Sequence, residues 1–229
     1  MLLKVPQAAL IAFTAVTLGA CQKDSNRTPS EPARHDEISQ SATKREVPRK
    51  YDGPFGLKMG LTRDEVKHMV AGLTTSEDEP GWAKSSTVPV PHPDFESYAH
   101  QFSEKSGLCK IVAIGKDISS GDAGIEVRSA FDSLDEALTT RYGKGKKYDF
   151  TSERYDSPEF WMMHLLQKNR TLAKIWGTEY GSTLTNDLGS IGLEASATDM
   201  STGFLVVRYE FTNLQDCIAE DKAQKNKGL

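Results

Sequence analysis

Residues 191–211 read IGLEASATDMSTGFLVVRYEF, and the fold class follows from the spacing of the apolar side chains in this stretch. Apolar residues alternate with polar or small ones before a turn-like segment at residues 198–203, and apolar residues recur at every second position after it. A period of two is that of a β-strand with one buried face, so the stretch predicts an antiparallel hairpin. The alternating positions are Ile191, Leu193, Ala195 and Ala197 in the first strand and Leu205, Val207, Tyr209 and Phe211 in the second.

More strands are predicted upstream of this hairpin. Residues 98–102 and 109–114 form a second hairpin around the turn SEKSG, and residues 171–176 form a further strand. Each of these runs is short and bounded by polar or glycine-containing segments, as expected for strands of an antiparallel sheet.

Three helices are predicted around the strands. Thr62 and Glu65 form a capping box before apolar residues that repeat at helical spacing. A second helix lies within residues 125–142, and Ser157-Pro158-Glu159 opens a third that reaches about residue 169. Helices interspersed with hairpins indicate an α+β fold, in which an antiparallel sheet of hairpins packs with three or four helices. A helix and a hairpin occur in each half of the domain, which suggests a degenerate duplication.

The N-terminus has the anatomy of a signal peptide. Lys4 precedes an apolar run at residues 8–20, which is shorter than the roughly 20 residues that a membrane span needs. The run ends in Leu18-Gly19-Ala20-Cys21, which resembles the lipobox of bacterial lipoproteins. This resemblance implies cleavage before Cys21, attachment of acyl chains such as palmitate to Cys21 and, because Gln22 rather than aspartate follows, sorting to the outer membrane. The alternative is an ordinary secretory signal with an incidental cysteine.

Residues 22–50 predict a flexible tether. Only four of these residues are apolar, so the segment cannot bury enough surface to offset the entropy of ordering it. As a coil it spans about 30 Å. The chain therefore divides into a signal peptide at residues 1–20, a lipidated cysteine with its tether at 21–50, and a periplasmic globular domain at 51–229.

The cysteine count agrees with a periplasmic location. If Cys21 carries lipid, Cys109 and Cys217 remain, and two thiols in an oxidising compartment favour a disulfide over two buried free thiols. The bridge would close a loop of about a hundred residues, worth about 4–5 kcal/mol in the chain-entropy model. Because no activating base stands near either cysteine in sequence, a catalytic thiol is not predicted.

A second resemblance lies at the start of the folded domain, within residues 56–73. The pattern Gly60-Leu61-Thr62-x-x-Glu65-Val66 resembles the start of the SmpA/OmlA (BamE) family, small outer-membrane lipoproteins that assist barrel assembly. The chain is longer than the single small domain of that family. The resemblance implies an envelope protein that acts through a protein partner.

Catalytic motifs are not found in the sequence. It contains no Gly-x-Ser-x-Gly, phosphate-loop, His-Glu-x-x-His or Cys-x-x-Cys motif, and its five histidines show no metal-ligand spacing. No catalytic, cofactor-binding or metal-binding residue is therefore assigned, and no cofactor is expected. The net charge of −4 also argues against nucleic-acid binding.

Two clusters are candidates for a partner surface. Lys144, Lys146 and Lys147 form a basic loop that could contact anionic headgroups or simply aid solubility. Trp161 and Met162 lie in an apolar helical turn, which predicts either core packing or a groove for a partner.

Three classes of function remain. The first is a non-enzymatic protein-binding module of the cell envelope, such as an assembly factor, an inhibitor or an immunity-type protein. The second is a periplasmic hydrolase, which predicts a deep cleft with a perturbed group such as His100 or His164. The third is a lipid or small-ligand carrier, which predicts a dry cavity under the sheet. The anchor, the tether and the absence of catalytic motifs favour the first.

Overall fold

An antiparallel sheet of nine strands lies at the centre of the part of the chain that the computed structural model describes, residues 52–75, 79, 81–152 and 157–228. The strands are β1 (Thr74–Thr75), β2 (Trp82–Ser85), β3 (Phe95–Ser103), β4 (Gly107–Gly115), β5 (Ile118–Ser119), β6 (Lys146–Thr151), β7 (Arg170–Gly177), β8 (Leu188–Ala197) and β9 (Thr202–Phe211). The predictions for the signal peptide, the lipidated Cys21 and the tether lie outside the described residues.

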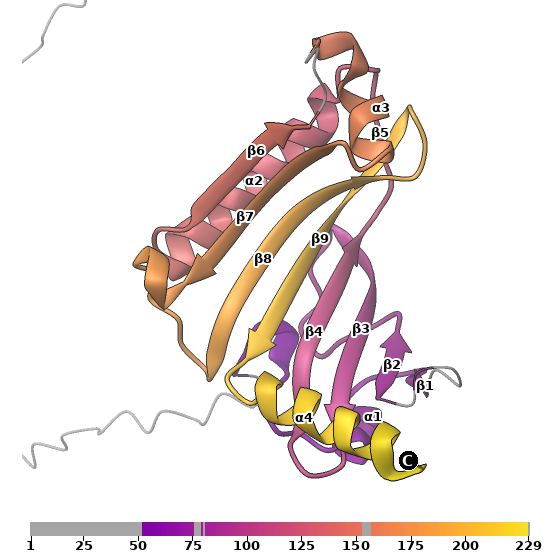
Figure 1. Cartoon of the computed structure of the whole chain (residues 1–229), viewed down its shortest axis with the longest axis vertical. Coiled ribbons are helices and arrows are strands. Elements are labelled where there is room, and N and C mark those ends of the chain that lie inside the picture. The colour runs from indigo at the N-terminus through magenta and orange to yellow at the C-terminus, as the bar shows by residue number, and fades with distance from the viewer. Residues whose placement is uncertain (1–51, 76–78, 80, 153–156, 229) are drawn as a thin grey trace, which may run out of the picture. The chain divides into compact units, whose positions relative to one another are not determined.

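Four α-helices accompany the sheet in the described residues, so the α+β prediction is confirmed at this level (Figure 1). They are α1 (Arg63–Met69), α2 (Ile125–Tyr142), α3 (Trp161–Leu166) and α4 (Leu214–Lys225), with short 3-10 turns at Pro54–Gly56, Pro158–Phe160, Thr178–Tyr180 and Asn226–Gly228. None of these helices is long and apolar enough to cross a membrane.

The order of the strands repeats a simple pattern. The sheet runs β1-β2-β3-β4-β9-β8-β7-β6, and the short β5 pairs with the end of β9. One helix precedes a set of four strands twice, α1 before β1–β4 and α2 before β6–β9, although the second set has α3 inserted between β6 and β7. The last strands of the two sets, β4 and β9, pair with each other. The predicted duplication concerns ancestry, and it stays a prediction.

The hairpin predicted within residues 191–211 is present. Its strands are β8 and β9, in the register that places Leu193 opposite Val207 and Ala195 opposite Leu205. The hairpin predicted around SEKSG corresponds to β3 and β4.

The capping box of the first helix is also confirmed. The Thr62 hydroxyl accepts a hydrogen bond from the Glu65 backbone N–H at 3.2 Å, and the Glu65 carboxylate accepts one from the Thr62 N–H at 2.7 Å. The helix predicted from Ser157 is shorter than expected. It begins as a 3-10 turn and ends at Leu166, because Lys168 turns the chain with a φ of 63°.

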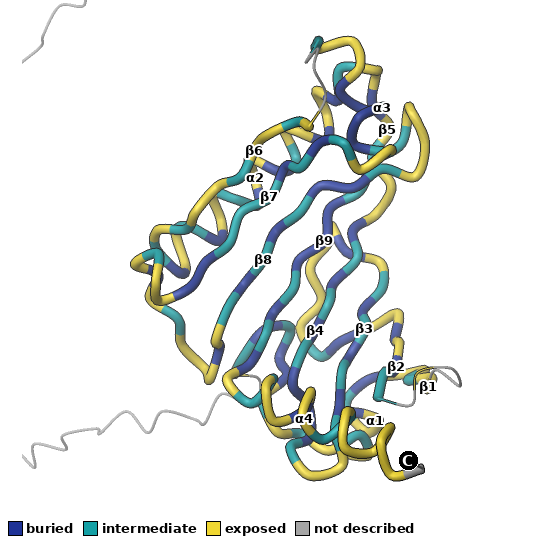
Figure 2. The backbone as a smooth tube through the Cα atoms, in the orientation of Figure 1, coloured by how far each residue is buried: buried dark blue, intermediate teal, exposed yellow. Residues whose placement is uncertain are grey.

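One face of the sheet carries the core. The buried side chains of α2 pack against β8 and β9, and in Figure 1 this helix lies behind the strands. The Phe55 ring contacts Phe95, Tyr98 and Tyr209, so the N-terminal turn covers the other half of the same face. We call this the covered face, and Figure 2 shows buried residues alternating with less buried ones along β3, β4, β8 and β9.

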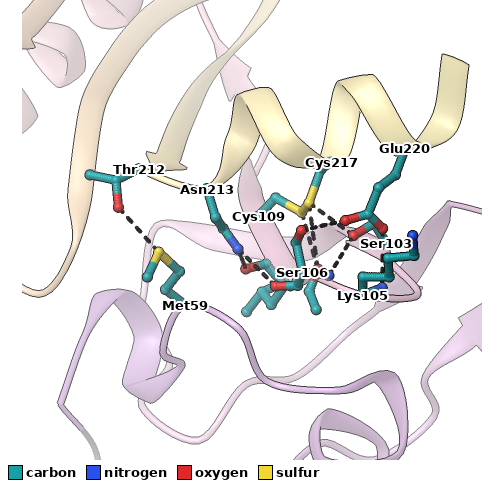
Figure 3. The surroundings of a disulfide bond; sticks show 11 residues. Met59, Ser103, Lys105, Ser106, Cys109, Thr212, Asn213, Cys217 and Glu220 are labelled. Carbon is teal, nitrogen blue, oxygen red and sulfur yellow. Dashed lines mark hydrogen bonds between the residues drawn. A yellow bond between two sulfur atoms is a disulfide. The ribbon is translucent and has the colours of Figure 1, made fainter. Parts of the chain in front are cut away.

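Helix α4 lies across the ends of β3 and β4 and is attached there covalently (Figures 1 and 3). Cys217 on α4 forms a disulfide with Cys109 on β4, as predicted. The Asn213 amide donates to the carbonyl of Ser106 at 2.8 Å, and the Glu220 carboxylate accepts from the Ser106 hydroxyl at 2.6 Å. The disulfide and these hydrogen bonds join the C-terminal helix to the turn between β3 and β4.

Candidate functional site

The second face of the sheet is the candidate site. Most side chains that point away from α2 are half-exposed along β4, β7, β8 and β9, while Ser196 and Val206 are buried. Of the four described helices only α4 lies on this side, at the ends of β3 and β4. We call this surface the open face. Its residues are Ser97, Ala99, Gln101, Lys110, Val112, Ile114, Lys146, Tyr148, Phe150, Thr171, Ala173, Ile175, Ser190, Gly192, Glu194, Ser196, Phe204, Val206, Arg208 and Glu210.

Two ion pairs cross the middle of the open face. Lys110 on β4 contacts the Glu210 carboxylate on β9 at 2.6 Å, and the Ser190 hydroxyl on β8 donates to the same carboxylate at 2.8 Å. Arg208 on β9 pairs with Glu194 on β8 at 2.5 Å. Burial alone would raise the pKa of Glu210, but the hydrogen bonds from Lys110 and Ser190 outweigh it and hold that pKa below its usual value. These pairs join β4 to β9 and β9 to β8 through their side chains.

Apolar side chains surround the ion pairs. Val112, Ile114 and Val206 form a contiguous group, since Ile114 and Val206 are direct cross-strand partners. At the sheet edge, Phe150 on β6 is 56% exposed, and Tyr148 lies two residues before it on the same strand. A solvent-facing side of an antiparallel sheet is normally polar. The open face therefore has the mixed composition of a binding surface rather than that of an ordinary solvated face.

A shallow hollow of about 200 Å³ lies in the open face above β8. Gly192 lies in the middle of the strands that line the hollow, where it pairs with Ile175 of β7 on one side and with Arg208 of β9 on the other. A methyl group built on Gly192 would meet no atom within 4 Å, so the missing side chain is what creates the space.

The prediction that Lys144, Lys146 and Lys147 form one basic loop is corrected by the structure. Lys146 and Lys147 begin the edge strand β6, and as neighbours on a strand they point to opposite faces. The Lys146 ammonium lies 5.3 Å from the Tyr148 ring and 5.8 Å from the Tyr180 ring, on the open-face side. Lys147 instead pairs with Asp132 of α2 at 2.9 Å. Lys144, Lys146 and Lys147 are exposed, but they do not form one patch.

The structure buries the other two predicted partner-surface residues. Trp161 is 4% exposed and Met162 is 0% exposed. The Trp161 ring packs on Gly124, where a methyl group would lie 2.0 Å from a ring carbon. Because neither side chain reaches the surface, both belong to the core, and the groove predicted around them is not present.

The two histidines considered for an enzyme site are also interior. His100 is 0% exposed, its Nε2 lies 2.9 Å from the Ser85 hydroxyl, and burial lowers its pKa to about 4. His164 is 6% exposed. Neither lines the hollow of the open face or the larger one, of about 490 Å³, between the start of α1 and the end of α4. In the described residues, no three His, Cys, Asp or Glu side chains cluster as metal ligands would.

Comparison of the chain with models of protein families, with curated proteins and with solved structures gave no match. The open face is therefore interpreted from its own chemistry. Its signal was present in the sequence, because the positions alternating with the predicted core of β9 include Phe204 and Val206, which a purely solvated face would not place there.

Proposed function

We propose that this protein is a lipoprotein anchored in the outer membrane, which binds another protein of the cell envelope through its open face. The observation that carries the proposal is the composition of that face. It combines the exposed Phe150 ring, partly buried aromatic and aliphatic side chains and pre-paired charges on one rigid sheet. Protein-binding surfaces are enriched in the same aromatic and arginine side chains.

The rigidity of the face supports binding to a folded partner. Each open-face strand is hydrogen-bonded to neighbours, and the opposite face is packed by α2 over β8 and β9 and by the N-terminal turn over β3. Side chains that are already ordered lose little entropy on association. The paired charges add a second advantage, because Lys110, Arg208, Glu194 and Glu210 are held in place before the partner arrives.

The sequence supplies the location. The lipobox-like Leu18-Gly19-Ala20-Cys21 supports anchoring through Cys21, and the polar residues 22–50 would let the domain reach partners about 30 Å from the membrane. An assembly factor, an inhibitor and an immunity-type protein would each use such a tethered module. We also infer that the two sets of one helix and four strands arose by duplication, which would have joined two half-sheets into one continuous face.

The test is crosslinking in the cell with p-benzoyl-L-phenylalanine at matched positions. Phe150 on the open face is 56% exposed, and Ile125 at the start of α2 is 64% exposed, so the two sites present the probe equally well. We expect a discrete protein adduct from position 150 and none from position 125. The adduct should decline in a Cys21→Ala variant. No adduct from position 150, or equal adducts from both positions, would contradict the proposal.

A further inference from the structure

The hollow on the open face has a defined chemistry. Its apolar lining comes from Ala173 and Ile175 on β7 and from the bare backbone at Gly192. The hollow lies on rigid strands, not on a loop, so its shape is fixed by the ladder between β7, β8 and β9. A side chain entering from above would lie flat on this backbone.

The rim of the hollow is polar but electrically balanced. Glu194, Glu210 and Arg208 belong to the lining of the hollow, and Lys110, outside the lining, pairs with Glu210. Because each carboxylate already has a cationic partner, a charged side chain would find no unpaired opposite charge there. A neutral hydroxyl would be accepted, because the oxygens of a carboxylate have four lone-pair positions and those of Glu194 and Glu210 are not filled by the hydrogen bonds they already receive.

The size of the hollow matches one aromatic ring. Its volume is about 200 Å³. For comparison, an apolar cavity of about 150 Å³ is large enough to hold one benzene molecule. A phenol ring would fill the hollow and lie beside the Arg208 side chain, which belongs to its lining.

We infer that the hollow at Gly192 is an anchor pocket for a tyrosine side chain presented on a loop of the partner protein. This inference rests on the proposed function, since it specifies how the open face recognises its partner. The tyrosine ring lies on Gly192 and Ile175, and its hydroxyl donates to Glu194 or Glu210 at the rim.

The pocket can be tested without the partner. The full chain, labelled with ¹⁵N, is titrated with N-acetyl-L-tyrosinamide while the backbone amide resonances are followed. We expect shifts that concentrate at Ile175, Gly192 and Arg208. N-acetyl-L-phenylalaninamide, which lacks the hydroxyl, should bind about fivefold more weakly, the effect of one hydrogen bond. The leucine and arginine analogues should shift these resonances less than either.

Two glycine variants provide a matched control. Gly192→Leu fills the pocket, whereas Gly121→Leu adds the same side chain at another glycine where a methyl group meets no atom within 4 Å. We expect Gly192→Leu to abolish the tyrosinamide shifts and Gly121→Leu to retain them. Shifts that persist in Gly192→Leu, shifts that are absent around the hollow in the parent chain, or equal shifts with the leucine or arginine analogue would overturn the inference.

The outcome for the pocket is separable from the outcome for the proposed function. If the crosslink from position 150 forms equally well in the parent chain and in Gly192→Leu, the open face binds a partner but the anchor pocket is wrong. If no crosslink forms in the parent chain, the protein-binding proposal is wrong, and with it the role of the pocket as an anchor. A crosslink that is lost in Gly192→Leu and retained in Gly121→Leu supports both.

Discussion

The two faces of the same strands differ sharply in what their side chains do. On β8 and β9 the covered face consists of fully buried residues such as Leu193 and Val207, whereas the open face on the same strands carries Glu194 and Arg208. The strand period of two separates these sets, although Ser196 and Val206 of the open face are buried. Under the proposed function, stability and recognition are encoded at alternating positions, so that substitutions on one face should change folding and substitutions on the other should change binding.

The largest effect on stability is expected on the covered face. Phe131 on α2 is 0% exposed and lies in the core cluster. Phe131→Ala should lower the free energy of unfolding by about 3–5 kcal/mol, because it removes a buried ring and leaves a cavity. Denaturant unfolding monitored by circular dichroism measures this. A loss below about 1 kcal/mol would show that the covered face is not the main source of stability.

Acid should destabilise the covered face through His100. Its folded pKa of about 4 lies below its ordinary value of 6.5, so the unfolded chain binds the proton more readily. The free energy of unfolding is therefore unaffected by His100 above pH 6.5 and decreases as the pH falls toward 4, by about 3 kcal/mol in total.

The control for this prediction is His100→Leu, which removes the titrating group. Free energies of unfolding measured at several pH values should fall less steeply between pH 6.5 and 4 in His100→Leu than in the parent chain. Identical slopes would contradict the assignment of the acid sensitivity to His100.

The disulfide between Cys109 and Cys217 joins α4 to the sheet, and its removal should have a slightly smaller effect. A Cys109→Ala/Cys217→Ala variant should lose about 2–4 kcal/mol, the typical measured range for a disulfide, which lies below the chain-entropy value for so long a loop. Hydrogen exchange should accelerate most in α4 and in the turn between β3 and β4, beyond the acceleration that the amides of the sheet share through global unfolding. Equal acceleration in α4 and in the sheet would contradict a local role for the bridge.

The smallest effect on stability is expected on the open face. The Arg208 and Glu194 side chains are 37% and 36% exposed. Arg208→Ala should therefore change the free energy of unfolding by no more than about 1 kcal/mol. The same variant should reduce the adduct from position 150 about tenfold, as expected for an arginine that anchors an interface. A large loss of stability with unchanged crosslinking would show that Arg208 contributes to folding and not to binding, which contradicts the roles assigned to the two faces.

The sequence alone predicted the elements whose signals are local. The alternation around Ile191 and Leu205 and the capping box of Thr62 and Glu65 each reside in a few neighbouring residues, and the structure confirms them. Strand β6 was predicted as a basic loop, because its strand conformation depends on pairing with β7 and on the contact of Lys147 with Asp132. Helix α4 was not placed, because it depends on the disulfide and on hydrogen bonds to a turn that is distant in sequence.

The candidate site was predicted only in part. Lys146 does lie on the open face, but Trp161 and Met162 lie in the core. Which face of a sheet is left open depends on where the helices pack, and that is a property of the whole fold. The apolar character of Phe204 and Val206 was visible in the sequence, but without the position of α2 it could not be assigned to an uncovered surface.

Carboxyl footprinting in intact cells tests the central claim most directly. A water-soluble carbodiimide modifies accessible carboxylates, and the open face offers Glu194, 36% exposed, and Glu210, 32% exposed, while Asp132 on α2 is 66% exposed. The account predicts that, relative to the purified chain, modification of Glu194 and Glu210 falls in cells while that of Asp132 does not change. Equal modification of all three in cells and in the purified chain would contradict the claim that the open face is occupied by a partner.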